Sequence, residues 1–449
     1  MEGPPSPRQF KPHVPLIPLP PESAPRAIRR VPVLRSSDKI LKSGRFLPTL
    51  PILPEQGSRN PRFKQRNVLK TEIPKSTRVS INRLPNLPIT PEEAKKSYND
   101  ILSSFEQFEI TQFPEIYYIG NVNNKFTQNF DDKNHSYKVI IGDHLAYRYE
   151  ILLVLGSGAF GKVVKCFDHK NKVLVAVKII ISTQQMAEQS KIEASSLAKV
   201  NKIDTNNIVR AYDFFVFRNH PCITYELLGS SLRGQRVITP SIKPICYQIF
   251  SALVSLKKCG IIHCDIKPDN LLFIQDTPKV KLIDFGTSCI SGRQIFTYIQ
   301  SRYYRAPEVI LGCGYDHEID VWSAALVCIE LITGKPLFPG SNEIDMLRLF
   351  IEFLKYPPIE LLRKSSRVLN FFDDKYRPLF HVKPGTKNIL DFVGSIDPQF
   401  YDLLTQCLRW LPAERFTPEQ ALAHPYFSDI VPQSNLPDLR ASYKGETLG

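Results

Sequence analysis

Proline interrupts the first 90 residues of this 449-residue chain so often that they cannot form a regular fold. Of the 37 prolines, 17 lie there, as in the run Val14-Pro15-Leu16-Ile17-Pro18. Proline fixes φ and lacks an amide donor, so neither a helix nor a central strand can pass through such a run. We therefore predict a disordered tail over residues 1–86, with local polyproline II conformation.

The same segment carries nearly all of the positive charge. Residues 1–90 hold 17 Lys and Arg against 5 Asp and Glu, a net charge of +12 out of the formal +14. The remaining 359 residues are left at +2. This distribution argues against a fold built to bind nucleic acid and predicts a near-neutral body with a basic arm. The arm is either a docking segment for a partner protein or a solvated linker, and composition alone favours the linker.

The apolar runs and the cysteines limit where the protein can reside. No run approaches 18 apolar residues, so no membrane-spanning helix is expected. The first residues contain no apolar stretch of the kind found in a secretory signal. The nine cysteines are scattered and form no CxxC pair, which indicates a reducing compartment. We expect a cytoplasmic protein, with the nucleus as the alternative.

Beyond the tail, the pattern predicts an ordered chain with a β-rich part followed by a helical part. Thr90-Pro91-Glu92-Glu93 reads as a capping box, and apolar residues follow it at helical spacing as far as Phe105. This helix needs a surface to pack on, because residues 90–148 are too few for a core of their own. A β-rich part is predicted next, and a helical part after Gly229, which gives an α+β, two-lobed arrangement. Expected strands are 149–155, 163–167, 173–180, 208–217 and 222–228, and expected helices are 185–200, 242–258, 318–333, 343–354 and 399–410.

A glycine-rich motif opens the β-rich part. Residues 156–163 read G-x-G-x-x-G-x-V, and glycines let backbone amides approach a phosphate without obstruction by Cβ. In a dinucleotide-binding fold the loop would open a helix, but here Val163–Phe167 continue as a predicted strand. The loop alone is a weak signal, and its meaning depends on the motifs further along the chain.

Four further motifs occur in a fixed order. They are Val175-Ala176-Val177-Lys178, His263-Cys264-Asp265-Ile266-Lys267-Pro268-Asp269-Asn270, Asp284-Phe285-Gly286 and Ala306-Pro307-Glu308. Lys178 needs an acidic partner on the following helix; Glu193 lies near the middle of that helix, and Glu188 is the alternative. Together with the glycine loop, these motifs make a chance arrangement on another fold very improbable.

The chain thus resembles a eukaryotic protein kinase over residues 149–427, with an N-lobe over 149–228 and a C-lobe over 229–427. The resemblance implies ATP and Mg²⁺ as cofactors, protein substrates as partners and a monomeric enzyme. It implies that Asp265 handles the substrate hydroxyl proton, that Lys267 stabilises the transferring phosphate, and that Lys178, held by Glu193, binds the α- and β-phosphates. Asn270 and Asp284 are the implied Mg²⁺ ligands. The implied ATP-binding residues are Leu155, Gly156, Ser157, Gly158, Ala159, Phe160, Gly161, Lys162, Val163, Ala176, Lys178, Tyr225 as gatekeeper, Glu226, Leu227, Leu228 and Leu272. Glu308 is expected to pair with Arg415, and Asp320 to anchor the catalytic loop.

The activation segment indicates which family of protein kinases the chain resembles. Phe296–Glu308 is similar to that of the dual-specificity tyrosine-regulated kinases (DYRK), as is Cys264 at a position where most kinases have Arg. Residues 87–148 look like the accessory region of class II members, including the DYRK homology box, and residues 428–449 are expected to be a tail. The resemblance implies a Ser/Thr kinase, typically acting before Pro, that phosphorylates its own Tyr298. The alternatives are another kinase of the same CMGC group and a kinase-fold scaffold acting through the tail.

Two finer expectations concern the activation segment. Cys264 cannot bind an activation-loop phosphate, so we predict that phospho-Tyr298 docks on Arg302 and Arg305. An unmodified Tyr298 that simply packs is the alternative. Cys264 and Cys289 lie on loops that are adjacent in kinases, which allows either a reversible oxidative pair or two buried small apolar residues.

Overall fold

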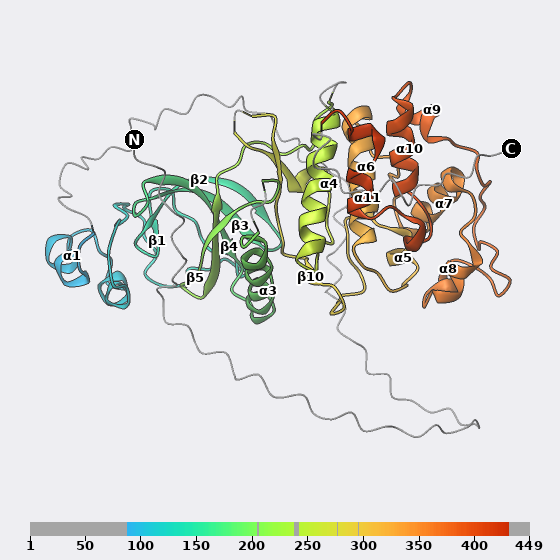
Figure 1. Ribbon diagram of the computed structural model, residues 1–449. Coiled ribbons are helices and arrows are strands. Elements are labelled where there is room, and N and C mark those ends of the chain that lie inside the picture. The colour runs from blue at the N-terminus through green and yellow to red at the C-terminus, as the bar shows by residue number, and fades with distance from the viewer. Residues whose placement is uncertain (1–87, 204–205, 238–241, 276, 295, 431–449) are drawn as a thin grey trace, which may run out of the picture. The chain divides into compact units, whose positions relative to one another are not determined.

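The computed structural model describes residues 88–203, 206–237, 242–275, 277–294 and 296–430 (Figure 1). The predicted tail 1–86 and most of the predicted C-terminal tail lie outside the described residues. Within the described part, no helix is long and apolar enough to span a membrane.

An antiparallel sheet forms the first half of the described chain. Its strand order is β1-β2-β3-β4-β6-β5, so β6 lies between β4 and β5. The sequence favours strands here because β-branched and aromatic residues dominate these segments. The strands are β1 His144–Leu145, β2 Tyr149–Gly158, β3 Gly161–Asp168, β4 Val173–Ile180, β5 Ala211–Phe217 and β6 His220–Glu226.

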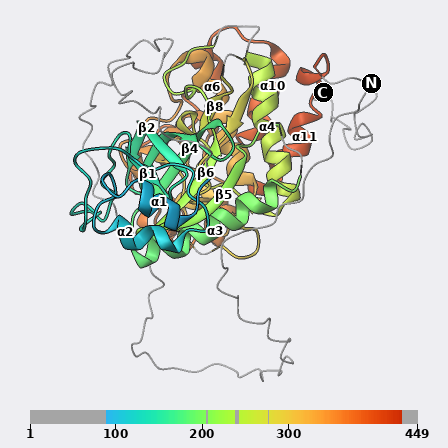
Figure 2. The ribbon, with the colours of Figure 1, turned by 90° about the vertical axis from the view of Figure 1, so that its left-hand side faces the viewer.

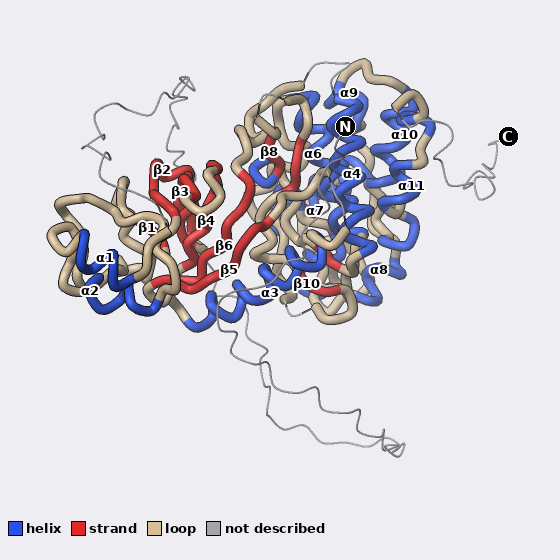
Figure 3. The backbone as a smooth tube through the Cα atoms, turned by 60° about the vertical axis from the view of Figure 1, so that its left-hand side comes forward, coloured by secondary structure: helices blue, strands red, loops and turns tan. Residues whose placement is uncertain are grey.

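Helix α3, Gln184–Val200, lies against this sheet and contacts β4, β5 and β6 (Figure 2). The second half of the chain is mainly helical, with strands and helices largely separated (Figure 3). Two short antiparallel pairs, β7 with β10 and β8 with β9, lie between helices α4 and α5 in sequence. The remaining elements are α4 Ile242–Lys258, β7 Ile261–Ile262, β8 Leu271–Phe273, β9 Val280–Leu282, β10 Cys289–Ile290, α5 Pro307–Ile310, α6 Glu318–Thr333, α7 Glu343–Leu354, α8 Ile359–Lys364, α9 Ile389–Val393, α10 Pro398–Cys407 and α11 Pro418–Leu422.

The predicted α+β arrangement, with a β-rich part followed by a helical part, is confirmed. Helix α6 is buried almost throughout, including Trp322, and α4 packs against it and against α11. The apolar core around these helices continues into the first half through Leu197 and Ile223. The predicted helices 242–258, 318–333 and 343–354 match the observed bounds. The glycine loop differs, because β2 runs on to Gly158 and pairs directly with β3.

The capping box at Thr90 is confirmed, but its helix is shorter than predicted. Helix α1, Pro91–Ser97, begins with Thr90 accepting from the Glu93 amide while the Glu93 carboxylate accepts from the Thr90 amide. The chain leaves the helix at Tyr98. A second helix, α2 Glu106–Glu109, then begins after Ser103, which exchanges hydrogen bonds with Glu106. Of the residues that followed helical spacing in the sequence, only Ala94 lies in a helix, and those from Tyr98 to Phe105 lie between α1 and α2.

The prediction that this region packs on the sheet is confirmed. Tyr147, which lies just before β2, is buried in a cluster with apolar residues of the region, including Ile110 and Ile116. Its carbonyl oxygen accepts from the amides of Tyr117 and Tyr118. The accessory region therefore shares its core with the chain entering the sheet.

A buried ionic contact joins the accessory region to the turn between β5 and β6. Arg218, which adopts a left-handed φ of 48°, donates to both carboxylate oxygens of Glu109 at 2.9 and 2.8 Å. Its guanidinium also lies 4.2 Å from the centroid of the Phe130 ring. The Tyr147 hydroxyl donates to the same carboxylate at 2.9 Å. Both ion-pair partners are almost fully buried, so each depends on the other for solvation.

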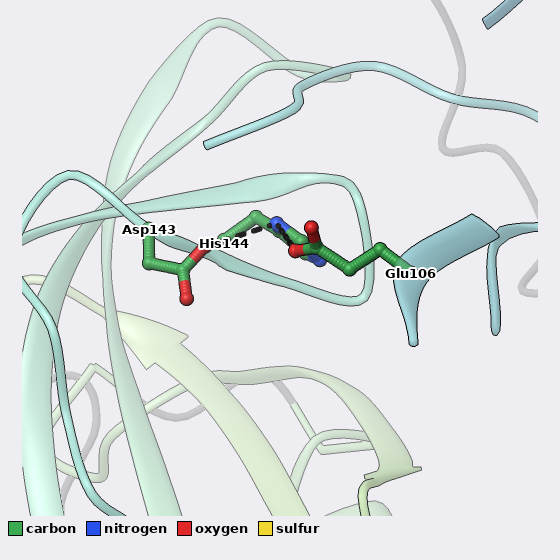
Figure 4. A group of neighbouring side chains, drawn as sticks. All are labelled: Glu106, Asp143 and His144. Atoms are coloured by element: carbon green, nitrogen blue, oxygen red, sulfur yellow. Dashed lines mark ion pairs between the residues drawn. The ribbon is translucent and has the colours of Figure 1, made fainter. Parts of the chain in front are cut away.

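Next to this pair, Glu106, Asp143 and His144 point toward one another (Figure 4). His144 Nδ1 lies 3.2 Å from Asp143 Oδ1 and 3.7 Å from Glu106 Oε1. The protein supplies its own cations here, because Lys125 Nζ lies 2.9 Å from Glu106 Oε2 and Arg218 lies 3.6 Å from Oε1. Lys125 and Arg218 thus place two cations of the protein itself beside the carboxylates of this group.

Candidate active site

Lys178 joins three elements at the centre of the site. From β4 its Nζ lies 2.8 and 2.9 Å from the two carboxylate oxygens of Glu193 in α3, and 2.9 Å from Asp284 Oδ1. Glu188, the alternative partner, instead forms an exposed pair with Lys191. The predicted assignment to Glu193 therefore agrees with the geometry.

The charges in this group stabilise one another. Burial would lower the pKa of Lys178, but the carboxylates of Glu193 and Asp284 together raise it above its usual value. Burial would raise the pKa of Asp284, yet the neighbouring ammonium of Lys178 lowers it to about 2. Both groups are thus charged at neutral pH, as an ion-binding site requires.

The catalytic loop places Asp265 among hydrogen-bond donors. Its Oδ2 accepts from Lys267 Nζ at 2.5 Å and from Asn270 Nδ2 at 3.2 Å. Its Oδ1 accepts from the Ser301 amide at 3.0 Å and the Ser301 hydroxyl at 2.8 Å. Sequence reasoning missed Ser301, since this contact spans 36 residues and the sequence around Ser301 carries no signal for it.

Asp320 fixes the backbone of this loop, as predicted. Its carboxylate accepts from the amides of His263 at 2.7 Å and Cys264 at 3.0 Å. Burial raises the pKa of Asp320 to about 7, while these two amide donors act in the opposite direction. Cys264 and Asp284 both adopt left-handed φ angles, 67° and 64°. Such backbone strain is commonly held in place at functional sites.

The glycines of the loop 156–161 separate into two kinds. At Gly161, with φ of 135°, an added Cβ would lie 2.0 Å from the Ile179 carbonyl oxygen, so the fold itself requires glycine. At Gly156 and Gly158 an added Cβ would meet nothing within 4 Å. Protein packing does not explain these two glycines, but close approach of a phosphate does.

The remaining predicted nucleotide residues surround the same region of the sheet. Ala176 of β4 pairs with Tyr225 of β6, and Leu272 lies in β8. The Glu226 carboxylate accepts from Lys281 Nζ at 2.5 Å and from the Arg210 amide at 2.7 Å, which fixes the end of β6. The Lys162 ammonium donates to the Tyr137 carbonyl at 2.7 Å, so this cation is engaged by the accessory region. The other predicted residues are Leu155, Ser157, Ala159, Phe160 and Val163 in the β2–β3 hairpin, and Leu227 and Leu228 after β6.

The residues present fit ATP and Mg²⁺. Asp284 supplies carboxylate oxygens, and Asn270 uses its amide nitrogen toward Asp265, so its remaining polar atom is an oxygen. Oxygen ligands of this kind suit Mg²⁺. Lys178 provides a buried positive charge beside them for a phosphate group.

The surroundings of Tyr298 differ in part from the prediction. The Arg305 guanidinium lies 4.0 Å from the centroid of the Tyr298 ring, as an arginine close to this tyrosine was expected to do. Arg302 instead donates to the Ser341 carbonyl. Tyr298 itself is exposed.

Arg367 shares an acidic partner with Arg305 and was not predicted in this group. It binds Glu343 through both guanidinium nitrogens, at 3.0 and 2.6 Å, and Arg305 lies 3.5 Å from the same carboxylate. Tyr298 contributes to raising the pKa of Arg367, after the larger effect of Glu343. The sequence gives no hint of this contact, because Arg367 lies after α8, far from the activation segment.

Cys264 and Cys289 are in contact. Their Sγ atoms lie 3.6 Å apart, and both residues are buried. The hydrogen bond with Cys264 lowers the pKa of Cys289, whereas burial raises the pKa of Cys264. The opposite directions of these shifts favour the thiolate form at Cys289 over Cys264.

The predicted pairing of Glu308 with Arg415 is confirmed. The guanidinium nitrogens lie 2.7 and 3.1 Å from the carboxylate oxygens, and both side chains are fully buried. Arg415 also donates to the Glu318 carbonyl at 2.8 Å, which links the pair to the start of α6.

Comparisons with known proteins agree with this geometry. Residues 149–427 match the family model described as the protein kinase domain. The human dual specificity tyrosine-phosphorylation-regulated kinase 4 is 39% identical over 403 residues, which cover 83% of this chain and 77% of the relative. The mouse dual specificity tyrosine-phosphorylation-regulated kinase 3 is 37% identical over 391 residues, covering 77% of this chain and 67% of the relative.

A more distant organism carries a similar protein. The Serine/threonine-protein kinase ppk5 of Schizosaccharomyces pombe is 40% identical over 358 residues, which cover 72% of this chain and 42% of that protein. Similarity thus extends beyond the kinase domain in the first two relatives. The chain belongs to the protein kinases and, among them, to the family of dual specificity tyrosine-phosphorylation-regulated kinases.

Proposed function

We propose that this protein is a dual-specificity kinase that transfers phosphate from ATP to Ser and Thr of protein substrates, with a preference for sites before Pro, and to its own Tyr298. The observation that carries the proposal is the paired arrangement of Lys178, Glu193 and Asp284 beside an Asp265 held by Lys267 and Asn270. All the charged groups needed for phosphoryl transfer are present.

Each residue has a role set by its contacts. Asp265 orients the substrate hydroxyl and accepts its proton through a carboxylate oxygen, while Lys267, 2.5 Å away, places positive charge where the phosphate transfers. Asn270 and Asp284 would hold Mg²⁺, which supplies neutralisation of the phosphate charge when bound. Lys178 would bind the α- and β-phosphates, with the glycine loop above them.

Two other interpretations predict different results. Another kinase of the CMGC group would not need residues 88–148, but Tyr137 of this region shares a core cluster with the sheet, and Glu109 of this region pairs with Arg218. A scaffold acting through the basic tail would not need an intact Asp265 environment.

We also propose a cytoplasmic or nuclear enzyme, supported by nine cysteines that are all free thiols.

The direct test is turnover of purified full-length protein with ATP and Mg²⁺ on arrays of Ser, Thr and Tyr peptides. We expect transfer to Ser and Thr peptides with Pro at the next position, and a single phosphotyrosine on the enzyme. Transfer limited to Tyr peptides, or equal transfer whatever the next residue is, would contradict the assigned specificity. Mass spectrometry of the protein as expressed would locate the enzyme's own phosphate.

Phosphorylation of Tyr298 is expected to fix the activation segment. A phosphate carries about −1.5 to −2 charge, Arg305 lies against this tyrosine, and Arg367 shares the Glu343 carboxylate with Arg305. We expect Tyr298→Phe to fold normally and to lose about tenfold in kcat/KM, measured on a peptide substrate. Exposed Tyr356→Phe is the control and should keep wild-type activity. Full activity of bacterial wild-type protein without phosphate at Tyr298 would refute this role.

The contact between Cys264 and Cys289 predicts a disulfide under oxidation. The Cys289 thiolate would reduce hydrogen peroxide, forming a sulfenic acid and water, and the Cys264 thiol would then displace a second water to close the bond. We expect peptide mapping after peroxide treatment to show the two cysteines linked, and Cys289→Ser to abolish the link. If only reduced thiols or higher oxides appear, the two residues act as buried apolar groups.

A further inference from the structure

Tyr225 reaches the carboxylate on which the active site depends. Its hydroxyl lies 2.9 Å from Glu193 Oε1, the same oxygen that accepts from Lys178 Nζ at 2.8 Å. Tyr225 belongs to β6, Lys178 to β4 and Glu193 to α3, so three elements meet at one carboxylate. Sequence reasoning placed Tyr225 beside the nucleotide but gave it no hydrogen bond.

The direction of this bond is fixed by burial. Tyr225 is 9% exposed and Glu193 is 2% exposed. Burial raises the pKa of the Tyr225 hydroxyl well above its usual value, so the hydroxyl keeps its proton and donates it to the carboxylate. Hydrogen bonds to an ionised acceptor in a water-poor site are stronger than neutral ones.

We propose that Tyr225 is a positioning residue whose hydroxyl holds Glu193, and with it α3, in the arrangement in which Lys178 is paired. The inference rests on the proposed kinase function only for its kinetic consequence. The hydrogen bond itself is a property of the fold and can be tested without turnover.

The position of Tyr225 suits this task. β6 is an interior strand with β4 on one side and β5 on the other, so the backbone of Tyr225 is held from both sides. Lys178, by contrast, divides its ammonium between Glu193 and Asp284 and would also bind phosphates. The Tyr225 hydroxyl has one proton and donates it to Glu193, so it can hold Glu193 in position while Lys178 binds the phosphates of the nucleotide.

A further contact joins α3 to the segment after Asp284. Gln189 Nε2 donates to the Gly286 carbonyl at 2.7 Å. This partner lies in the activation segment, which must rearrange when its state changes. Tyr225 therefore adds a polar contact that holds the Glu193 end of the ion pair independently of the activation segment, beside the apolar packing of Leu197 and Val200.

Hydrogen exchange in nucleotide-free full-length protein tests the inference. We expect Tyr225→Phe, which removes one oxygen and keeps the ring, to speed exchange of the α3 amides about tenfold while α4 and α6 amides keep wild-type rates. The matched control is Tyr212→Phe on the adjacent strand β5, a half-buried tyrosine for which the described structure shows no bond to α3; it should leave α3 unchanged. Exchange in α3 within twofold of wild type would overturn the proposal, and faster exchange in α4 and α6 as well would show general loosening instead.

Kinetics give the second readout. Because Glu193 orients Lys178, we expect Tyr225→Phe to lower kcat about three- to tenfold with the KM for ATP changed less than twofold. An unchanged kcat alongside faster α3 exchange would remove the catalytic part of the inference. If wild-type protein shows no phosphoryl transfer at all, the proposed function fails, while the exchange result still decides whether Tyr225 holds α3.

Discussion

Replacing Asp265 with Asn is expected to lower kcat about 1000-fold and to leave bacterially expressed protein without phosphate at Tyr298. A positioned general base contributes roughly 10²- to 10⁴-fold to such reactions. Asn also presents an amide donor where Lys267 and Ser301 already donate, so at least one donor loses its acceptor. The measurement combines turnover of a protein substrate with intact mass of the purified enzyme.

The control for this variant is Asp269→Asn, on the same loop. Asp269 is a partly exposed partner of Arg233 and does not contact Asp265 in the described structure. It should retain activity within a few fold and carry the Tyr298 phosphate. Equal turnover in wild type and Asp265→Asn would defeat both the catalytic assignment and self-phosphorylation, and would favour a scaffold.

The second large effect is expected at Arg218, far from the chemistry. Arg218→Gln should destabilise the protein by about 3–5 kcal/mol, because it leaves the buried Glu109 carboxylate without its charged partner. For a body of this size that corresponds to a melting temperature lower by about 4–7 °C, measured by scanning fluorimetry. The accessory region should become sensitive to proteases before the kinase domain does.

Arg348→Gln is the matched control for Arg218. Its ion pair with Asp345 is exposed, one turn away on α7, and such pairs contribute about 0.5 kcal/mol or less. Its melting temperature should stay within a degree or two of wild type. A similar value for Arg218→Gln would mean that the accessory region is held by apolar packing alone.

The sequence predicted those parts of the molecule that depend on local pattern. Helix α6 could be located because its apolar residues form one continuous stretch that ends at the C-cap Gly334. The capping box at Thr90 could be located because it involves only four consecutive residues. The kinase motifs likewise place Lys178 and Asp265 through their neighbours in the chain. The apolar run after Thr90 misled the prediction of helix length, because Tyr98 packs against the cluster around Tyr147 instead of continuing the helix.

The contacts that could not be predicted join distant segments. Ser301 with Asp265, Tyr225 with Glu193, and Arg367 with Glu343 are each ordinary residue types whose partners are set by tertiary packing. Lys162 shows the same limit. Its place in the glycine loop suggests a phosphate ligand, while the folded chain directs its ammonium to the Tyr137 carbonyl.

The pairing of Glu109 with Arg218 also sets an order of events during synthesis. Translation proceeds from the N-terminus, so Glu109 is synthesised 109 residues before its partner Arg218. At about 5–20 residues per second this delay is roughly 5–20 seconds. During that interval a carboxylate destined for the interior must stay in water, and α2 cannot settle. The accessory region, although it precedes the sheet in the chain, therefore completes its fold only after strand β5 has been made.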